Sequence, residues 1–318
     1  MAYDGRANVV EIDDDARVVA FDLCRKKKIT GAKLGPILGL SDLSTPFKVA
    51  LELARIYPGD PPNKYIDAGN ILEPRIRSYV RRNSAALLPG PLGVPTGTQL
   101  VIEEPVDKEK CGYDHFHDNA VFGGLVDGYI GYEGRRQAVL EIKTSNDRER
   151  FMDADGGYTK VPDAYLMQAG LYAQLSGLDR IVFAVGFLED DDYARPGFWT
   201  PTPENCVMIG MERPDMSKPM ADAEAWYREY IDNGETPEWT EKDAPLVKWL
   251  KAYDPNKRQR NGRRRRLSYR KLEPCSLFAY RRLGVPPSTR TSAERERAGK
   301  PAGGPAGHQA QSCRARLA

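Results

Sequence analysis

The sequence contains no apolar run long enough to span a membrane, and it has few of the residues that build cysteine or histidine metal clusters. Its 5 cysteines are an odd number without C-x-x-C spacing, and there are only 3 histidines. These absences argue against a membrane protein, a disulfide-stapled secreted domain and a zinc ribbon. Acidic residues stand where an export signal needs an apolar core, so we expect a cytoplasmic protein.

Charge is distributed unevenly along the chain. The net charge is only +2, but residues 256–318 contain 17 Lys and Arg against 3 Asp and Glu, whereas residues 1–255 contain 30 against 42. An acidic body does not attract nucleic acid through its mean charge, so DNA contact would need a local basic channel, metal ions or the basic tail. We therefore expect a loose lead-in at 1–20, a folded domain at 21–255 and a disordered Pro/Gly/Arg-rich tail at 256–318.

The most informative segment of the sequence is a predicted hairpin that carries acidic side chains. Residues 121–145 predict two strands joined by a polar, glycine-containing turn. With a loop at 133–135, Asp127 faces Glu141, and the side-chain period of two adds Lys143 to the same face. Opposed carboxylates repel each other, and oxygen-binding Mg²⁺ or Mn²⁺ would relieve that repulsion. The alternative is that these residues lie on a solvent-exposed face of a sheet and have no catalytic role.

Two predicted helices carry a polar residue on an apolar face. In the helix expected at 65–83, Glu73 interrupts the apolar stripe. A carboxylate there needs a metal ion or an ion pair, for which Arg75 and Arg77 are the neighbouring partners. The helix that follows the hairpin carries Gln168. A buried amide needs partners for its oxygen and its nitrogen, so Gln168 serves either a core network or a water or phosphate in a site.

A basic turn begins at Arg25 and leads to a short predicted helix with Thr30 as its N-cap. Free backbone N–H groups at a helix start, together with the flanking cationic side chains, can bind a phosphate. A solvated basic turn is the alternative reading of the same pattern.

A polar loop holds Cys111, His115 and His117 close together in the sequence. Zinc binding would require a fourth ligand, and the C-x3-H-x-H spacing offers no clear one. An ordinary loop is therefore favoured over a zinc site.

Five segments, taken in order, resemble the YqaJ-type viral recombinases, relatives of lambda exonuclease within the PD-(D/E)xK nuclease superfamily. The segments are ITGAKLGPILGLS at 29–41, GNILEP at 69–74, GLVDG at 124–128, EIKT at 141–144, and the stretch from Val161-Pro162 to Gln168 and Tyr172. The resemblance covers about residues 22–235. It implies an α/β (α+β) restriction-endonuclease-like fold with a central mixed β-sheet flanked by helices.

The resemblance also implies the residues of an active site. The metal ligands would be Glu73, Asp127, Glu141 and the backbone carbonyl of Ile142. These groups would bind one or two Mg²⁺ ions, for which Mn²⁺ would substitute. Lys143 would position or deprotonate the attacking water, and Gln168 would orient that water or the scissile phosphate. Contacts to DNA phosphate would come from Arg25, Thr30 and Tyr172. Two serines that grip the 5′-phosphate in lambda exonuclease are replaced by Ala32 and Leu125.

The expected function is a Mg²⁺-dependent deoxyribonuclease, an exonuclease that resects linear duplex DNA for single-strand annealing recombination in a bacterium or a phage-infected cell. By resemblance, its partners would be an annealing protein and two further copies of the chain in a ring. One alternative is a RecB-like nuclease with an iron–sulfur cluster, which is disfavoured because no tight cysteine triplet follows Gln168. The other is a non-catalytic DNA-binding or assembly protein whose acidic hairpin is structural.

Overall fold

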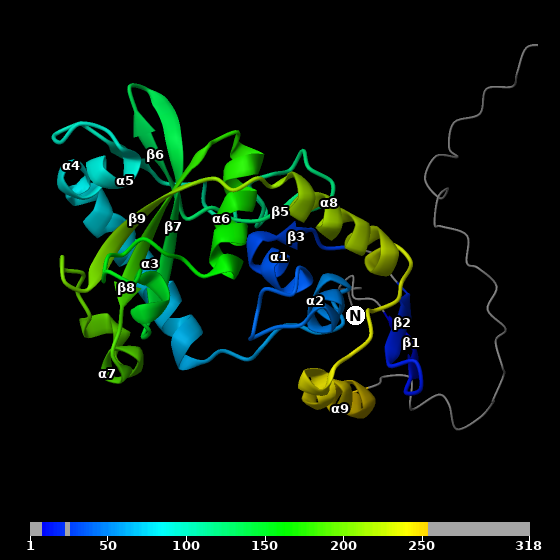
Figure 1. Cartoon of the computed structure of the whole chain (residues 1–318). Coiled ribbons are helices and arrows are strands. Elements are labelled where there is room, and N and C mark those ends of the chain that lie inside the picture. Colours follow the sequence, from blue (N-terminus) through cyan, green and yellow to red (C-terminus); the bar gives the residue numbers. More distant parts are fainter. Residues whose placement is uncertain (1–7, 23–25, 254–318) are drawn as a thin grey trace, which may run out of the picture. The chain divides into compact units, whose positions relative to one another are not determined.

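The computed structural model describes residues 8–22 and 26–253 (Figure 1). The strands are β1 (Asn8–Asp13), β2 (Val18–Asp22), β3 (Ile29–Thr30), β4 (Val101–Glu103), β5 (Phe122–Gly123), β6 (Gly128–Tyr132), β7 (Arg135–Ser145), β8 (Arg180–Phe187) and β9 (Cys206–Glu212). The α-helices are α1 (Gly31–Ile37), α2 (Pro46–Leu53), α3 (Lys64–Arg82), α4 (Ser84–Leu87), α5 (Pro89–Leu92), α6 (Asp163–Ser176), α7 (Asp190–Ala194), α8 (Ser217–Trp226) and α9 (Ala244–Tyr253). Within the described ranges, none of the helices has the length and apolarity that a membrane crossing requires.

A mixed sheet of five strands forms the centre of the fold, in the order β4-β6-β7-β8-β9. β7 and β8 run parallel, and every other neighbouring pair in this sheet is antiparallel. The parallel pair requires a crossover, and α6 supplies it on one face of the sheet, while α3 packs on the other face (Figure 1). This arrangement confirms the predicted mixed sheet flanked by helices.

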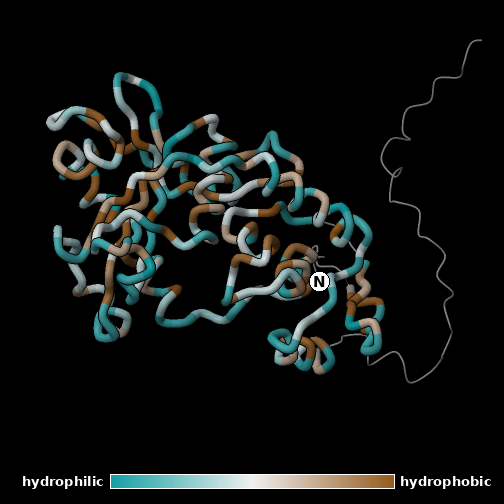
Figure 2. Tube along the Cα trace, viewed as in Figure 1, coloured by the Kyte–Doolittle hydropathy of each residue, from teal (hydrophilic) through white to brown (hydrophobic). Residues whose placement is uncertain are grey.

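The alternation of side chains along β7 separates two hydrophobic cores. Leu140 and Ile142 pack with α3, whereas Val139 packs with α6 on the opposite face. Hydrophobic segments follow the central strands, while the tip of the β6–β7 hairpin is hydrophilic (Figure 2). Because the period is two residues, Glu141 and Lys143 lie on the α6 face, as the sequence predicts.

The β6–β7 hairpin reaches the predicted register by a different turn. Its loop consists of Glu133 and Gly134 alone, both at positive φ (50° and 74°), which is typical of a type I′ turn. The predicted loop at 133–135 is therefore wrong by one residue. An irregularity in the pairing between Ile130 and Gly131 then restores the register, so the ladder ends with Gly128 opposite Leu140. Asp127, the preceding residue, accepts the backbone N–H of Ile142 and lies near Glu141.

Residues 8–22 form an antiparallel ribbon, β1–β2, instead of the expected loose lead-in. Val19 and Phe21 are buried in a third core together with α1, α2 and α9, and the Phe21 N–H donates to the Gly234 carbonyl at 2.7 Å. The expectation of a loose segment is thus wrong for residues 8–20, because short strands with acidic exposed sides do not show clear apolar alternation.

Other predicted elements are confirmed with shifted ends. The helix expected at 65–83 is α3, which continues through Pro74. The helix start at Pro46 is also correct, and the Thr45 side chain caps it by accepting the Lys48 N–H at 3.1 Å. The tail predicted at 256–318 lies outside the described residues.

Gly124→Ala is expected to destabilise the protein. Gly124 has a φ of +131°, and a Cβ there would lie 2.6 Å from the Tyr172 hydroxyl oxygen. Strain and overpacking each cost about 1–3 kcal/mol, so we expect the free energy of unfolding in chemical denaturation to fall by about 2–5 kcal/mol. Gly59→Ala is the control, because its φ is +105° but, apart from the two adjacent residues, no heavy atom of the described chain lies within 4 Å of its Cβ position. Equal losses in both variants would rule out the contact with Tyr172 as the cause.

Candidate functional site

Glu141 on β7 is the centre of the candidate site. Its side chain is buried, and Oε1 accepts hydrogen bonds from Lys143 Nζ at 2.7 Å and from Gln168 Nε2 on α6 at 2.6 Å. Oε2 is buried as well and has no hydrogen-bond partner among the described residues. A buried carboxylate oxygen without a partner is costly, so this arrangement favours a proton or a cation at Oε2.

Asp127 immediately precedes β6 and supplies the second carboxylate. Its Oδ2 accepts the backbone N–H of Ile142 at 2.7 Å. Burial and the nearby charge of Glu141 raise the pKa of Asp127 well above its ordinary value, and burial likewise raises the pKa of Glu141. Both carboxyl groups therefore hold protons more tightly than exposed acids do, and the pair is a favourable place for positive charge.

Lys143 is an ammonium group in this arrangement. Burial alone would lower its pKa, but the charges of Glu141 and Asp127 outweigh burial and raise the pKa of Lys143. Its Nζ also lies 5.0 Å from the centre of the Tyr165 ring. A protonated Lys143 can position a water or a phosphate by donating hydrogen bonds.

Glu73 lies on α3 at the edge of the buried stripe, with 38% of its side chain exposed. It pairs with Arg77 one turn along the helix, so the ion pair weighed against metal binding is present. Arg77 Nε also donates to the backbone carbonyl of Asp127 at 2.7 Å. Glu73 nevertheless raises the pKa of Asp127 and of Glu141, which places its charge near both.

The structure thus assembles two of the three predicted carboxylates. Asp127 and Glu141 lie together, whereas Glu73 is turned toward Arg77. Among the described residues, no group of three or more His, Cys, Asp or Glu side chains is gathered for a metal ion. An oxygen-binding divalent ion fits the Asp127–Glu141 pair, because the buried Glu141 Oε2 has no partner in the part of the chain that the structure describes and both pKa values are raised.

The residues predicted to contact DNA phosphate have different surroundings. Tyr172 is 3% exposed, its hydroxyl accepts the Gly31 N–H at 3.2 Å, and its ring stacks on Phe116. This burial contradicts the predicted phosphate contact and makes Tyr172 a packing residue. Thr30 precedes α1, but its side chain makes no capping hydrogen bond within the described chain. Arg25 lies outside the described residues.

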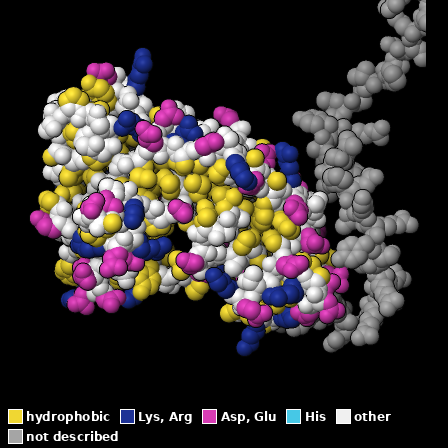
Figure 3. Space-filling model, in the orientation of Figure 1, with side chains coloured by type: hydrophobic (Ala, Val, Ile, Leu, Met, Phe, Trp, Pro, Cys, Tyr) yellow, Lys and Arg dark blue, Asp and Glu magenta, His cyan; other side chains and the backbone are white. Residues whose placement is uncertain are grey.

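Lysines of the basic turn are engaged in ion pairs. Lys26 pairs with Asp232, and Lys28 pairs with Asp114 at 2.7 Å. On the face drawn in Figure 3, Lys and Arg side chains are interspersed with Asp and Glu, and a hollow opens between the side carrying α7 and the side carrying α2. Contact with DNA on this face would therefore depend on local groups and not on a broad basic surface.

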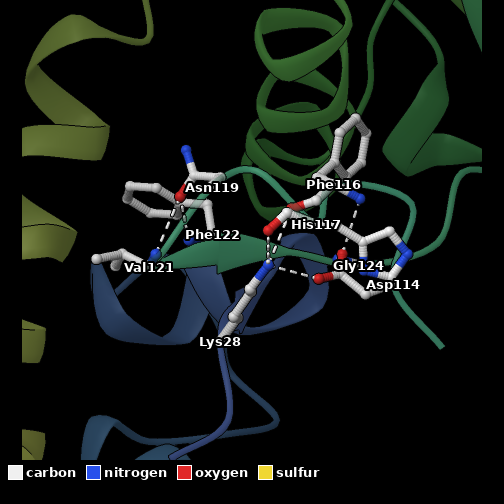
Figure 4. A network of polar contacts seen from close by, with 8 residues as sticks. All are labelled: Lys28, Asp114, Phe116, His117, Asn119, Val121, Phe122 and Gly124. Carbon is white, nitrogen blue, oxygen red and sulfur yellow. Dashed lines mark hydrogen bonds and ion pairs between the residues drawn. The ribbon is translucent and has the colours of Figure 1, made fainter. Parts of the chain in front are cut away.

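Lys28 and Asp114 organise the loop that leads to Asp127 (Figure 4). Lys28 Nζ donates to the Asp114 carboxylate at 2.7 Å and to the Phe116 carbonyl at 2.9 Å. Asp114 Oδ1 accepts the backbone N–H groups of Phe116 at 2.9 Å and of Gly124 at 3.0 Å. The network therefore fixes the chain three residues before the candidate ligand.

His115 extends this network and is not available to a metal. Its Nδ1 accepts the Val126 N–H at 3.0 Å, and its Nε2 lies 2.9 Å from the Val106 carbonyl oxygen. Both ring nitrogens are engaged, which supports the expectation of an ordinary loop over a zinc site. Sequence reasoning missed the network. The available signal was that Asp114 and Asn119 stand where side chains commonly cap their own loops.

Asp114→Asn is expected to lower the free energy of unfolding by about 1–3 kcal/mol at neutral pH, because it removes a charge-assisted bond to Lys28. Burial would raise the pKa of Asp114, but the bonds from Lys28, Phe116 and Gly124 outweigh it and hold the pKa below the usual value. The stabilisation is present above the unfolded-state pKa and is lost as pH falls through the lowered folded-state value. Chemical denaturation from neutral to acidic pH measures this, with exposed Asp118→Asn as the control. A difference between the variants that is independent of pH would contradict the ionic role.

Comparisons with known proteins find relatives of limited similarity. No family model matches the chain, so membership of the YqaJ-type family stays a prediction. The chain is 29% identical over 262 residues to the uncharacterized protein MG373 of Mycoplasma genitalium, covering 71% of this chain and 87% of that protein. Its homolog in Mycoplasma pneumoniae is 26% identical over 263 residues, with the same coverage.

Two solved structures resemble the chain more distantly. An alkaline exonuclease from Laribacter hongkongensis is 17% identical with a TM-score of 0.43, over 71% of this chain and 92% of that one. A phage-related exonuclease from Haemophilus somnus is 16% identical with a TM-score of 0.40, over 65% and 96%.

Proposed function

We propose that this protein is a metal-dependent deoxyribonuclease whose active centre is Asp127, Glu141, Lys143 and Gln168. One observation carries the proposal: the buried Glu141 binds both Lys143 and Gln168 through one oxygen, its other oxygen has no hydrogen-bond partner among the described residues, and Asp127 lies nearby. A purely structural carboxylate would have both oxygens satisfied. The bare oxygen supports a cation site beside an ammonium and an amide.

Mg²⁺ or Mn²⁺ is the metal we propose, because both ions take oxygen ligands and retain positions for water and phosphate. Asp127, Glu141 and the backbone carbonyl of Ile142 would hold it. Glu73 would join only by releasing Arg77. The bound ion would neutralise the negative charge that develops on the phosphate during hydrolysis.

The polar side chains of the chain itself perform the remaining tasks. Lys143, held by Glu141 on a rigid strand, would orient the attacking water or a phosphate oxygen. Gln168 donates its amide N–H to Glu141, so its position on α6 is fixed relative to the strand. Arg77 holds the backbone of Asp127 and would keep this ligand in register with Glu141.

The family resemblance supports the finer parts of the proposal. These are exonucleolytic resection of linear duplex DNA, cooperation with a single-strand annealing protein and assembly of three copies into a ring. The replacement of the two phosphate-gripping serines by Ala32 and Leu125 favours an enzyme that does not require a 5′-phosphate.

Digestion of linear duplexes labelled separately at each end tests this proposal. The wild-type protein should release nucleotides in Mg²⁺ or Mn²⁺ and none in chelator, with and without a 5′-phosphate on the substrate. A circular duplex is the control for endonucleolytic cleavage. DNA binding without any hydrolysis in either metal would instead favour the non-catalytic DNA-binding protein.

A further inference from the structure

An aromatic cluster extends from the candidate active site to the surface. Tyr165 lies against Lys143, with the Nζ atom 5.0 Å from its ring centre. Tyr193 and Tyr65 pack edge to face with ring centres 4.8 Å apart, and Lys64 Nζ lies 5.1 Å from the Tyr65 ring centre. Burial, and to a smaller extent the neighbouring Tyr65 and Tyr165, raises the pKa of Tyr193 to about 12. The three rings therefore lie near one another.

The outer member of this cluster is exposed. Tyr65 is 51% exposed, whereas Tyr193 beneath it is buried. Both belong to helices that pack together, α3 and α7 (Figure 1). Tyr65 therefore presents a ring to solvent on a support that is already rigid, and a rigid exposed ring loses little entropy when a flat ligand stacks on it.

Gly69 leaves an open space on α3 between this ring and the candidate site. Tyr65, Gly69 and Glu73 are spaced four residues apart, so they lie along one ridge of the helix. Apart from the two adjacent residues and the nearby backbone of α3 itself, no heavy atom of the described chain lies within 4 Å of a Cβ placed on Gly69. Glycine destabilises a helix interior relative to alanine, and no neighbouring protein atom requires it here. The open space therefore suits the close approach of a ligand.

We propose that Tyr65, supported by Tyr193 and flanked by Lys64, stacks a nucleobase of the DNA strand whose backbone passes over Gly69 toward Glu141 and Lys143. The inference rests on the proposed nuclease function. An aromatic face accepts any base by stacking. The Lys64 ammonium pairs with Asp190 at 3.3 Å and would exchange this partner for the phosphate backbone. Such a platform holds the terminal nucleotides in place without reading their sequence.

Binding of a labelled duplex with a short single-stranded end tests the platform. Measurements by fluorescence anisotropy in Ca²⁺, which serves as a divalent ion in place of Mg²⁺ or Mn²⁺, would separate binding from hydrolysis. Tyr65→Ala should weaken binding about 5- to 100-fold, and Tyr65→Phe should bind like wild type. Ile71→Ala is the matched control, since Ile71 is 43% exposed on another side of α3.

Substrates with abasic sites in the single-stranded end supply the decisive comparison. Removing the bases should weaken binding to the wild type but leave binding to Tyr65→Ala unchanged, because the stacking partner is already absent. If Tyr65→Ala and wild type lose equal affinity with the abasic substrate, or if Tyr65→Ala binds normally, the platform is excluded. Failure of the wild type to hydrolyse DNA in Mg²⁺ or Mn²⁺ would overturn the nuclease function separately.

Discussion

Lys143→Ala is expected to reduce metal-dependent release of nucleotides from linear duplex DNA by roughly 10²- to 10⁴-fold, the range for losing a positioned proton-transfer or charge-stabilising group. The physical reason is placement. Lys143 is anchored by Glu141 and lies against Tyr165, so its charge is fixed where a phosphate would meet the carboxylate pair. Alanine removes that charge and leaves the backbone of β7 intact. The measurement is the initial rate of nucleotide release at saturating DNA.

The binding of DNA should survive this substitution. Lys143 is a single cation, and loss of one phosphate contact reduces affinity and salt dependence only slightly. Lys160→Ala is the matched control, because the Lys160 side chain is exposed. The alanine variant keeps the backbone N–H of residue 160, which donates to the Phe151 carbonyl at 3.2 Å. Thermal unfolding must accompany the assay, since Glu141 loses a buried partner. Equal hydrolysis by Lys143→Ala and Lys160→Ala would refute the catalytic assignment.

The arrangement of side chains in the hairpin is largely predictable from the sequence. Alternation along 121–145 predicts that Asp127 lies opposite Glu141 with Lys143 on the same face, and the structure places Asp127 near Glu141 and bonds Lys143 to Glu141. The loop prediction failed by one residue because Glu133 adopts a positive φ, which side-chain pattern does not reveal. The pairing survived because the ladder compensates for the shorter loop.

The features that the sequence does not predict are contacts between segments far apart in the chain. The ion pair of Lys28 with Asp114 and the packing of Tyr172 under Gly31 join residues far apart in the chain. Local pattern contains no information about such pairings. The sequence predicts Arg75 or Arg77 as the ion-pair partner of Glu73, because both arginines lie close to it along the helix. In the structure the partner is Arg77, four residues further along.

In metal-free protein, the contribution of Asp127 and Glu141 to the free energy of unfolding is expected to fall as pH rises from about 4 toward alkaline values. Burial raises the pKa of Asp127, whose ordinary value is 3.8, and of Glu141, whose ordinary value is 4.5. The folded state therefore binds protons more tightly than the unfolded state does. Stability from these groups is fully present below the ordinary values and is lost as pH rises through the raised ones.

Mg²⁺ should reverse this loss, and its effect should grow with pH. At low pH the ion must displace protons from the pair, whereas at high pH both carboxylates are ionised and ready to bind it. At a concentration of one hundred times Kd, a ligand specific for the folded state contributes about 2.7 kcal/mol. For a domain of this size, that corresponds to a Tm increase of roughly 5–10 °C. Thermal unfolding in chelator and in Mg²⁺ across pH measures the difference.

The Asp127→Asn variant distinguishes loss of the cation site from a general loss of stability. In chelator at alkaline pH this variant should unfold at a higher temperature than wild type, because the repulsion between the carboxylates of residues 127 and 141 is gone. It should also lose most of the Mg²⁺-dependent increase in Tm and the hydrolytic activity. Asp118→Asn, at an exposed position, should behave like wild type in both solutions. If Asp127→Asn were less stable than wild type in chelator and equally responsive to Mg²⁺, the carboxylate pair would be a structural feature and not a metal site.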